Sequence, residues 1–148
     1  MCPTITVIFG KNHLPFSWLI RVFTWSRWSH CGVVVGDNVI ESTAMKGVVI
    51  TPLKEFIERY NDHAFATIPV KDSVNEALDR ASNIIGDKYD FAAIFGIFFR
   101  TGWNQKGKWL CSEAVAHIAG TFRKDYVGRI TPEDIWRNSN DTVHNGIK

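Results

Sequence analysis

One cysteine in the chain stands at a position that favours a nucleophilic thiol. Cys111 follows a short apolar lead, Trp109-Leu110, and opens a predicted helix that ends at Gly120. The N–H groups of a first helical turn carry partial positive charge, which lowers the pKa of a thiol there and favours the thiolate. A buried, inert cysteine is the competing interpretation of this position. The pattern makes Cys111 a candidate nucleophile.

A histidine and a carboxylate that precede Cys111 in the chain complete a candidate catalytic set. Residues 29–35 predict a strand that carries His30 near its start, and strand alternation places Cys31 on the opposite face. Glu41 follows the turn at residues 36–38, so a hairpin brings its carboxylate near the imidazole. In cysteine hydrolases a base takes the thiol proton, and a third group holds the tautomer and orientation of that base. A structural histidine and a carboxylate at the sheet rim are the alternative interpretations.

Other thiols and imidazoles fit these roles less well. Cys31 is in mid-strand, which predicts a buried structural thiol, and Cys2 lies near the N-terminus and indicates nothing. His117 is six residues along the predicted helix from Cys111, which turns it away from the thiol. His144 falls in the polar end of the chain. The remaining histidines are His13 and His63.

The elements that would position these residues mix short strands and helices. β-Branched and aromatic runs predict strands at residues 4–9, 29–35, 39–42, 47–50 and 65–70. Amphipathic or apolar stretches predict helices at residues 14–28, 51–60, 73–85, 91–99, 111–119 and 131–136. Helix-start signals come from Thr51-Pro52, Thr131-Pro132 and a capping box of Ser73 with Glu76. We therefore expect an α+β fold in which a small antiparallel curled sheet packs against helices.

Length and composition limit the number of domains and the classes of protein to which the chain can belong. The 148 residues suit one domain, which we place at residues 1–137, followed by a polar, flexible tail at residues 138–148. A formal net charge of +2 is too small to indicate nucleic-acid binding. The three cysteines are odd in number, widely spaced and without a CxxC pair, so neither a disulfide framework nor a cysteine-built zinc site is predicted. We expect no metal and no organic cofactor.

The sequence also predicts that the chain does not span a membrane. No apolar run approaches the roughly 18 residues that a spanning helix needs. The N-terminus lacks the charged start, apolar core and cleavage site of a signal peptide. We expect a cytoplasmic protein, with release by lysis or packaging in a phage particle left open. The oligomeric state is left open as well.

Two blocks of sequence resemble the circularly permuted NlpC-type papain-like cysteine hydrolases, the YiiX-like group. The first block is SHCGVV at residues 29–34, followed by VIE at 39–41 and GVVITPL at 47–53. The second is GDKYDF at residues 86–91, followed by KWLCSE at 108–113. Unpermuted enzymes carry the tyrosine motif and the cysteine helix first, whereas the histidine strand leads here. The similarity covers about residues 20–132.

The resemblance implies a papain-like fold and cleavage of an amide, ester or thioester bond through an acyl-enzyme. It implies that Cys111 is the nucleophile, His30 the base and Glu41 the group that orients the base. Tyr89 matches a tyrosine near the thiol, where its hydroxyl would help the backbone N–H of Cys111 to bind the oxyanion. The implied substrate is a small amide or peptide-like acyl group.

Two other functions remain open at this stage. Acyltransferases related to lecithin retinol acyltransferase, and related thioesterases, also place histidine before cysteine, and residues 14–28 and 94–99 would then form an apolar lip that touches lipid. If these aromatics are core instead, Trp18, Phe23, Phe95 and Phe98 should be buried. The second alternative is a phage or host-interaction protein that keeps the fold without turnover.

Overall fold

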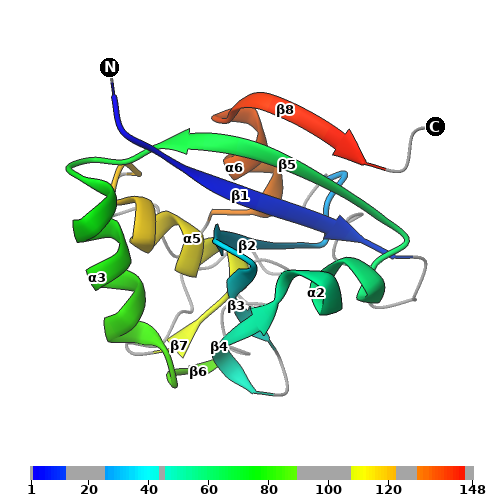
Figure 1. Ribbon diagram of the computed structural model, residues 1–148, viewed down its shortest axis with the longest axis horizontal. Coiled ribbons are helices and arrows are strands. Elements are labelled where there is room, and N and C mark those ends of the chain that lie inside the picture. The colour runs from blue at the N-terminus through cyan, green and yellow to red at the C-terminus, as the bar shows by residue number, and fades with distance from the viewer. Residues whose placement is uncertain (1, 13–25, 44–45, 90–107, 123–129, 146–148) are drawn as a thin grey trace.

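An antiparallel sheet organises the part of the chain that the computed structural model describes, residues 2–12, 26–43, 46–89, 108–122 and 130–145 (Figure 1). Its strands are β1 (Thr4–Lys11), β2 (His30–Val35), β3 (Asn38–Thr43), β4 (Gly47–Pro52), β5 (Asp62–Pro69) and β8 (Asn140–Asn145). Their order across the sheet is β4-β3-β2-β1-β5-β8. A separate short parallel pair joins β6 (Lys88–Tyr89) to β7 (Lys108–Trp109).

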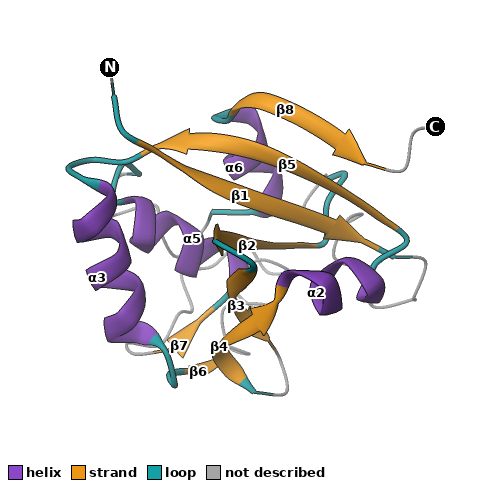
Figure 2. Cartoon of the chain, in the orientation of Figure 1, coloured by secondary structure: helices purple, strands orange, loops and turns teal. Residues whose placement is uncertain are grey.

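Helices cover both faces of this sheet (Figure 2). They are α2 (Leu53–Arg59), α3 (Val74–Ile84), α5 (Cys111–Ala119) and α6 (Pro132–Arg137). In Figure 1, α3 and α5 lie side by side on one flank of β2, and α2 lies on the other. The expected α+β architecture, an antiparallel sheet packed against helices, is confirmed.

Strand alternation in β1 explains why both faces are covered. Val7 and Phe9 point into the main core, which α3, α5 and α6 close. Ile8 points the other way and packs with Val39 and Phe56 under α2. Each of these side chains is fully buried, which is worth about 1.5–3 kcal/mol per large apolar residue. The sheet is thus a rigid partition with α5 on one face and α2 on the other.

Most predicted elements within the described residues are confirmed. Four of the five predicted strands run one to three residues longer at one or both ends, whereas β2 starts one residue later than predicted. The exception is the start of α2. Thr51 was predicted to cap this helix, but it is the penultimate residue of β4, and Pro52 takes the cap position without a side-chain bond. The hydroxyl of Thr51 donates instead to the buried carboxylate of Glu41. A hydrogen bond to a buried charge contributes more free energy at this position than a helix cap does.

The prediction of a loose tail at residues 138–148 differs from the structure. Asn140–Asn145 forms β8 and pairs with the outer edge of β5, so the sheet extends past residue 137. The strand is difficult to predict from the sequence because most of its residues are polar, residues 140–144 are exposed, and its pairing comes from backbone groups at an open sheet edge. His144 adds ring contacts with Trp28 and Trp136 at 6.1 and 5.3 Å between centroids.

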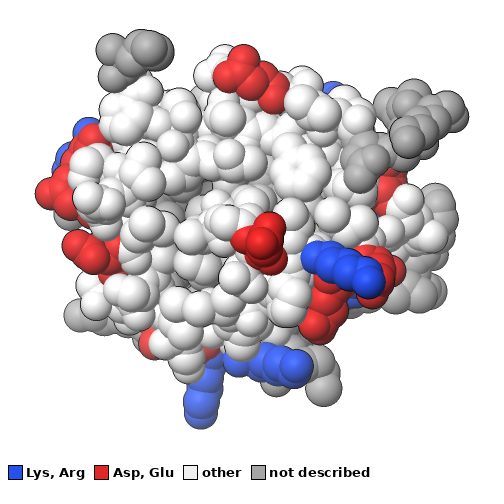
Figure 3. Space-filling model, in the orientation of Figure 1, with Lys and Arg blue, Asp and Glu red and all other residues white. Residues whose placement is uncertain are grey.

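Two expectations fall on residues outside the described parts of the chain. These are the body of the helix predicted at 14–28 and the helix predicted at 91–99, together with Trp18, Phe23, Phe95 and Phe98. Among the described residues, no helix is long and apolar enough to cross a membrane. On the face shown in Figure 3, the coloured acidic and basic side chains form small separate groups.

A glycine at the start of β4 fixes the contact between the sheet and β6. Gly47 has φ of +74°, and a Cβ there would lie 2.0 Å from the carbonyl oxygen of Asp87. Gly36 also has positive φ, +59°, but a Cβ there would meet nothing within 4 Å. We expect Gly47→Ala to lower the free energy of unfolding by about 3 kcal/mol, and Gly36→Ala by about 1 kcal/mol, because only Gly47 adds a backbone clash to the left-handed strain. Urea unfolding compares the two, and equal losses would contradict the argument.

Candidate active site

Contacts on both sides of Cys111 hold the start of α5 against the sheet. On the N-terminal side of Cys111, the carbonyl of Trp109 accepts a hydrogen bond from the Ser42 hydroxyl of β3 at 2.6 Å. After it, the Ser112 hydroxyl donates to the carbonyl of Ile130, which leads into α6. α5 packs directly on β2. Cys111 is therefore fixed at the start of β2, with 8% of its surface exposed.

α5 begins and ends at the residues that the sequence predicts. Leu110 is its N-cap, and the N–H of Leu110 donates to the carboxylate of Glu113 at 3.0 Å. Gly120 closes the helix in the left-handed conformation, with φ of 72°. Cys111 is consequently the first helical residue, where the free N–H groups of the first turn favour a negative charge on sulfur.

A set of hydrogen bonds fixes where β2 begins, and with it His30. The N–H and the hydroxyl of Ser29 both donate to the carbonyl of Gly10 in β1, at 3.1 and 3.2 Å. The N–H of Arg27 donates to the carboxylate of Glu133 in α6 at 3.1 Å. The segment before His30 is thereby tied to β1 and to α6.

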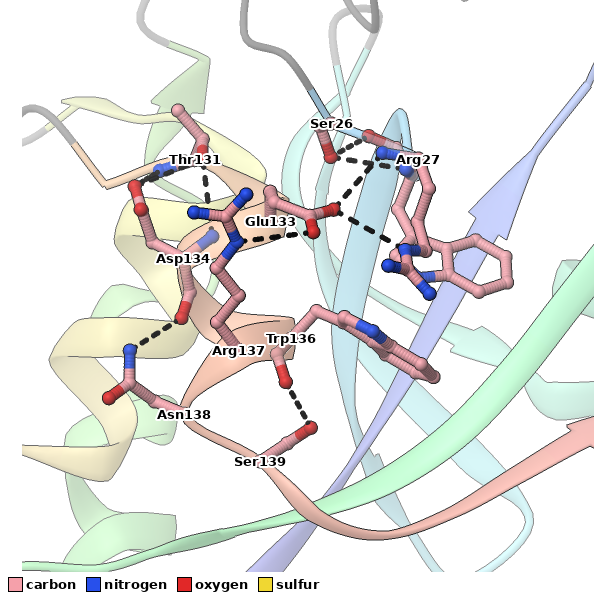
Figure 4. Close-up of polar contacts among 10 residues, drawn as sticks. Ser26, Arg27, Thr131, Glu133, Asp134, Trp136, Arg137, Asn138 and Ser139 are labelled. Carbon is pink, nitrogen blue, oxygen red and sulfur yellow. Dashed lines mark hydrogen bonds and ion pairs between the residues drawn. The ribbon is translucent and has the colours of Figure 1, made fainter.

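Glu133 links the segment before β2 to α6 (Figure 4). Its carboxylate is buried and accepts from the Arg27 N–H, with the side chains of Arg27 and Arg137 as further partners at 3.8 and 3.4 Å. Thr131 and Asp134 form a reciprocal capping box at the start of the same helix. The two arginines balance the buried negative charge of Glu133, and its carboxylate holds the segment before β2 against α6.

Glu41 holds the imidazole of His30 and is itself held from two other elements. The Oε2 atom of Glu41 lies 2.6 Å from Nε2 of His30. Thr51 donates to Oε1 at 2.7 Å, and the guanidinium of Arg59 in α2 binds both oxygens at 2.9 and 3.1 Å. The side chain of Glu41 is fully buried. Four hydrogen bonds therefore fix the carboxylate in one orientation.

The charges around Glu41 keep it ionised. Burial alone would raise the pKa of this carboxyl group, but the bonds and charges of His30, Arg59 and Thr51 outweigh it and lower the pKa to about 2. A bidentate guanidinium and a carboxylate make a strong, oriented pair. Glu41 consequently remains a carboxylate that faces the imidazole at any pH near neutrality.

Two residues of β2, Cys31 and His30, lower the pKa of the Cys111 thiol. A hydrogen bond from the Cys31 side chain lowers the pKa of Cys111 most; burial opposes this, and the charge and hydrogen bond of His30 add to the lowering. The net result is a pKa well below that of an ordinary thiol. The lowered pKa favours the thiolate, the form in which cysteine is a nucleophile.

The pKa of the His30 imidazole is raised, which favours its positively charged form. Burial would lower the pKa of its imidazole, but Tyr60, Cys111 and Glu41 together raise it well above the usual value. The rings of Phe56 and Tyr60 stack near the imidazole, with centroids 5.7 and 5.8 Å away. Tyr60 packs over Gly10, where an added Cβ would lie 2.7 Å from its ring. These rings limit how far the imidazole can rotate.

Three of the four predicted site residues come together, namely Cys111, His30 and Glu41. Tyr89 lies in β6 and is half-buried, and its backbone pairs with Trp109 in β7. That pairing places Tyr89 next to the segment that leads into the thiol.

The other histidines lie elsewhere. His63 is buried in β5 against Phe65. His117 packs on Trp109 at 4.6 Å between ring centroids, and His144 belongs to the aromatic group around Trp28. His13 is outside the described residues.

Sequence analysis missed the residues that support the site. Arg59 lies on an exposed helix face by pattern, and nothing in the sequence pairs it with Glu41 across 18 positions. Cys31 is predicted to be a buried structural thiol; it is fully buried, but it also lowers the pKa of the Cys111 thiol. A signal for this was present, because Cys31 directly follows His30 and the helix must approach the start of that strand.

Within the described residues, no three or more His, Cys, Asp or Glu side chains are grouped so that they could hold a metal ion.

Comparison with known proteins identifies the fold and the family of the chain. The fold is similar to that of the metalloprotein yiiX from Escherichia coli O157:H7, with a TM-score of 0.59 and 24% identity over 79% of this chain. The likeness spans 64% of that protein, less than two thirds of its length. Among curated proteins, none matches the chain. Residues 2–121 match the model of the permuted papain-like amidase enzymes, and the chain therefore belongs to this YaeF/YiiX, C92 family of papain-like amidases.

Proposed function

We propose that the chain is a cysteine amidase that works through an acyl-enzyme on Cys111, with His30 as the base. One observation supports this above the rest. A buried carboxylate, Glu41, lies 2.6 Å from an imidazole that helps to lower the pKa of a thiol at the first position of a helix. A nucleophile, a base and a group that orients the base are the parts that acyl transfer by cysteine requires.

The reaction begins with the thiolate already formed. Nε2 of His30 is bound to Glu41, which leaves Nδ1 for the sulfur. The thiolate of Cys111 attacks the substrate carbonyl, and the N–H of Cys111 and the hydroxyl of Tyr89 bind the oxyanion. The imidazolium then gives its proton to the leaving amine. Water, deprotonated by His30, attacks the acyl group, which releases the acid and restores the thiolate and the imidazolium.

Glu41 and Arg59 have distinct parts in this scheme. Glu41 holds the imidazole in one tautomer and stabilises its positive charge. Arg59 orients Glu41 and keeps the carboxyl group from taking the imidazole's proton, because a bidentate cation favours the ionised form. Arg59 is therefore a positioning residue, one step removed from the reacting atoms.

The substrate in this proposal is a small amide or peptide-like acyl group. The family description as amidases supports amide cleavage. The two segments on which a lipid-facing lip would depend, residues 14–28 and 94–99, lie almost entirely outside the described part of the chain. No observation in the described part favours the lipid or the non-catalytic alternative.

Brief alkylation tests the assignment of the nucleophile. At pH 6 an ordinary thiol, with a pKa of about 8.5, is almost wholly protonated, whereas a thiol with a strongly lowered pKa still reacts. We expect limiting iodoacetamide at pH 6 to label Cys111 before Cys2 and Cys31, although Cys2 is the exposed one. Peptide mapping by mass spectrometry identifies the labelled residue. Preferential labelling of Cys2 or Cys31 would contradict the proposal.

The acyl-enzyme can be sought in the same way. A reactive acyl donor such as a p-nitrophenyl ester should leave its acyl group on Cys111, visible as a mass increase on that peptide. Acylation elsewhere would count against the mechanism.

A further inference from the structure

The start of β2, which carries His30, is paired with the sheet on one side only. The backbone of His30 pairs with Gly10 of β1. On its other side β2 pairs with β3 at residues 33–35, so in the described sheet the backbone of His30 has no partner in β3. The position of the imidazole therefore depends on how the chain enters β2 through residues 26–29.

Two elements near the C-terminus, α6 and β8, hold that entering segment. The N–H of Arg27 donates to Oε2 of Glu133 in α6 at 3.1 Å, a bond that Figure 4 shows. The ring of Trp28 packs on Trp136 of α6 at 5.3 Å between centroids, and on His144 of β8 at 6.1 Å. Both elements lie beyond the part of the chain that matches the family model, so the match assigns them no role.

The ion pairs of Glu133 do not explain why its carboxylate is buried. The side chain of Glu133 is 8% exposed, whereas those of Arg27 and Arg137 are 55% and 71% exposed. Ion pairs with exposed guanidinium groups contribute little to stability, and burial of a carboxylate is costly. The closest of its contacts, at 3.1 Å, is instead with the backbone N–H of Arg27, three residues before His30.

We propose that Glu133 is a positioning residue for the proposed base, His30. Its hydrogen bond to the Arg27 N–H fixes the segment from which β2 begins, and with it the place of the imidazole relative to the thiol. The acceptor oxygen of Glu133 is needed for this role and its negative charge is not. The inference rests on the proposed function, because the place of the imidazole matters to catalysis only if His30 serves Cys111.

Three substitutions of Glu133 separate the hydrogen bond from the charge. Glu133→Gln keeps a carbonyl oxygen at the same reach, Glu133→Asp keeps the charge on a side chain one methylene shorter, and Glu133→Ala loses both. The rate at which iodoacetamide alkylates Cys111 is measured from pH 5 to pH 9 by peptide mapping. A displaced imidazole stabilises the thiolate less. We therefore expect the rate at pH 6 to fall roughly 10-fold or more in the Asp and Ala variants, and to stay within about twofold of wild type in Glu133→Gln.

Two further variants distinguish positioning from a general loss of stability. Asp134→Ala removes one half of the capping box at the start of α6, and Arg137→Ala removes an exposed ion-pair partner of Glu133. Neither removes the acceptor for the Arg27 N–H. Asp134→Ala should lower the free energy of unfolding in urea, but both variants should keep the wild-type alkylation profile.

An unchanged profile in Glu133→Asp and Glu133→Ala overturns the inference, as does a loss in Glu133→Gln or Asp134→Ala as large as that in Glu133→Ala. If Glu133→Ala does not fold, the milder Glu133→Asp decides. The wild-type profile tests the proposed function separately. A wild-type midpoint near that of an ordinary thiol, about pH 8.5, would overturn the proposed function and the inference with it. A low wild-type midpoint that all three Glu133 variants share overturns the inference alone.

Discussion

Replacing Cys111 with alanine is expected to lower amide turnover by roughly 10⁴-fold or more. The thiolate forms the covalent intermediate, and no other described side chain at the site offers a second nucleophile with a lowered pKa. The fold should remain, because the change removes one small atom from a site at the edge of the core. A panel of peptidyl coumarin amides measures turnover, and circular dichroism measures the fold.

The same variant has a second readout. Cys111 is one of the groups that raise the pKa of His30, so that pKa should fall in Cys111→Ala, as NMR titration of the ring would detect. Cys2→Ala is the matched control, since it is the same substitution at an exposed thiol, and it should leave turnover and the titration unchanged. Turnover by a correctly folded Cys111→Ala protein would end the cysteine-hydrolase interpretation.

Glu41→Gln is expected to lower kcat/KM by roughly 10²- to 10⁴-fold, less than the loss of the nucleophile. A glutamine has one carbonyl oxygen, so it cannot accept hydrogen bonds from both the imidazole and the bidentate guanidinium of Arg59. It also carries no charge to stabilise the imidazolium. The exposed Glu58, one residue before Arg59 in α2, provides the control, and Glu58→Gln should keep full activity.

The acid stability of Glu41→Gln should change in a defined direction. The folded-state pKa of Glu41 is about 2, below the ordinary value of 4.5, so the stability that Glu41 contributes is present above pH 4.5 and is lost as the pH falls toward 2. That contribution is at most about 3 kcal/mol. Wild type should therefore lose stability over this range, and Glu41→Gln should lose less. Urea unfolding at pH 5 and pH 3 makes the comparison, and parallel losses would exclude Glu41 as a strongly coupled carboxylate.

The parts of the site that local pattern controls could be predicted from the sequence. The helix that starts at Cys111 follows from its apolar lead and from Gly120. The proximity of His30 and Glu41 follows from the hairpin turn and from alternation, because register Val33↔Ile40 puts both side chains on one face of the sheet.

The supporting residues could not be predicted, because their partners are distant in sequence. Thr51 carries a helix-cap signal as strong as that of Thr131, and only the buried charge of Glu41 determines that its hydroxyl serves the carboxylate instead. Arg59 reaches Glu41 only once α2 is docked on the sheet. β8 was missed because its backbone, and not its side chains, makes the pairing.

The order of elements along the chain determines when the site can be assembled during synthesis. Residues 4–69 contain β1 to β5, so five neighbouring strands of the sheet leave the ribosome before any of α5. His30, Glu41 and Arg59 can pair in this segment at once. At about 5–20 residues per second, Cys111 follows Arg59 by roughly 3 to 10 s. The nascent chain thus carries the proposed base and its carboxylate before the proposed nucleophile, and the proposed amide cleavage cannot begin until residue 111 has been translated.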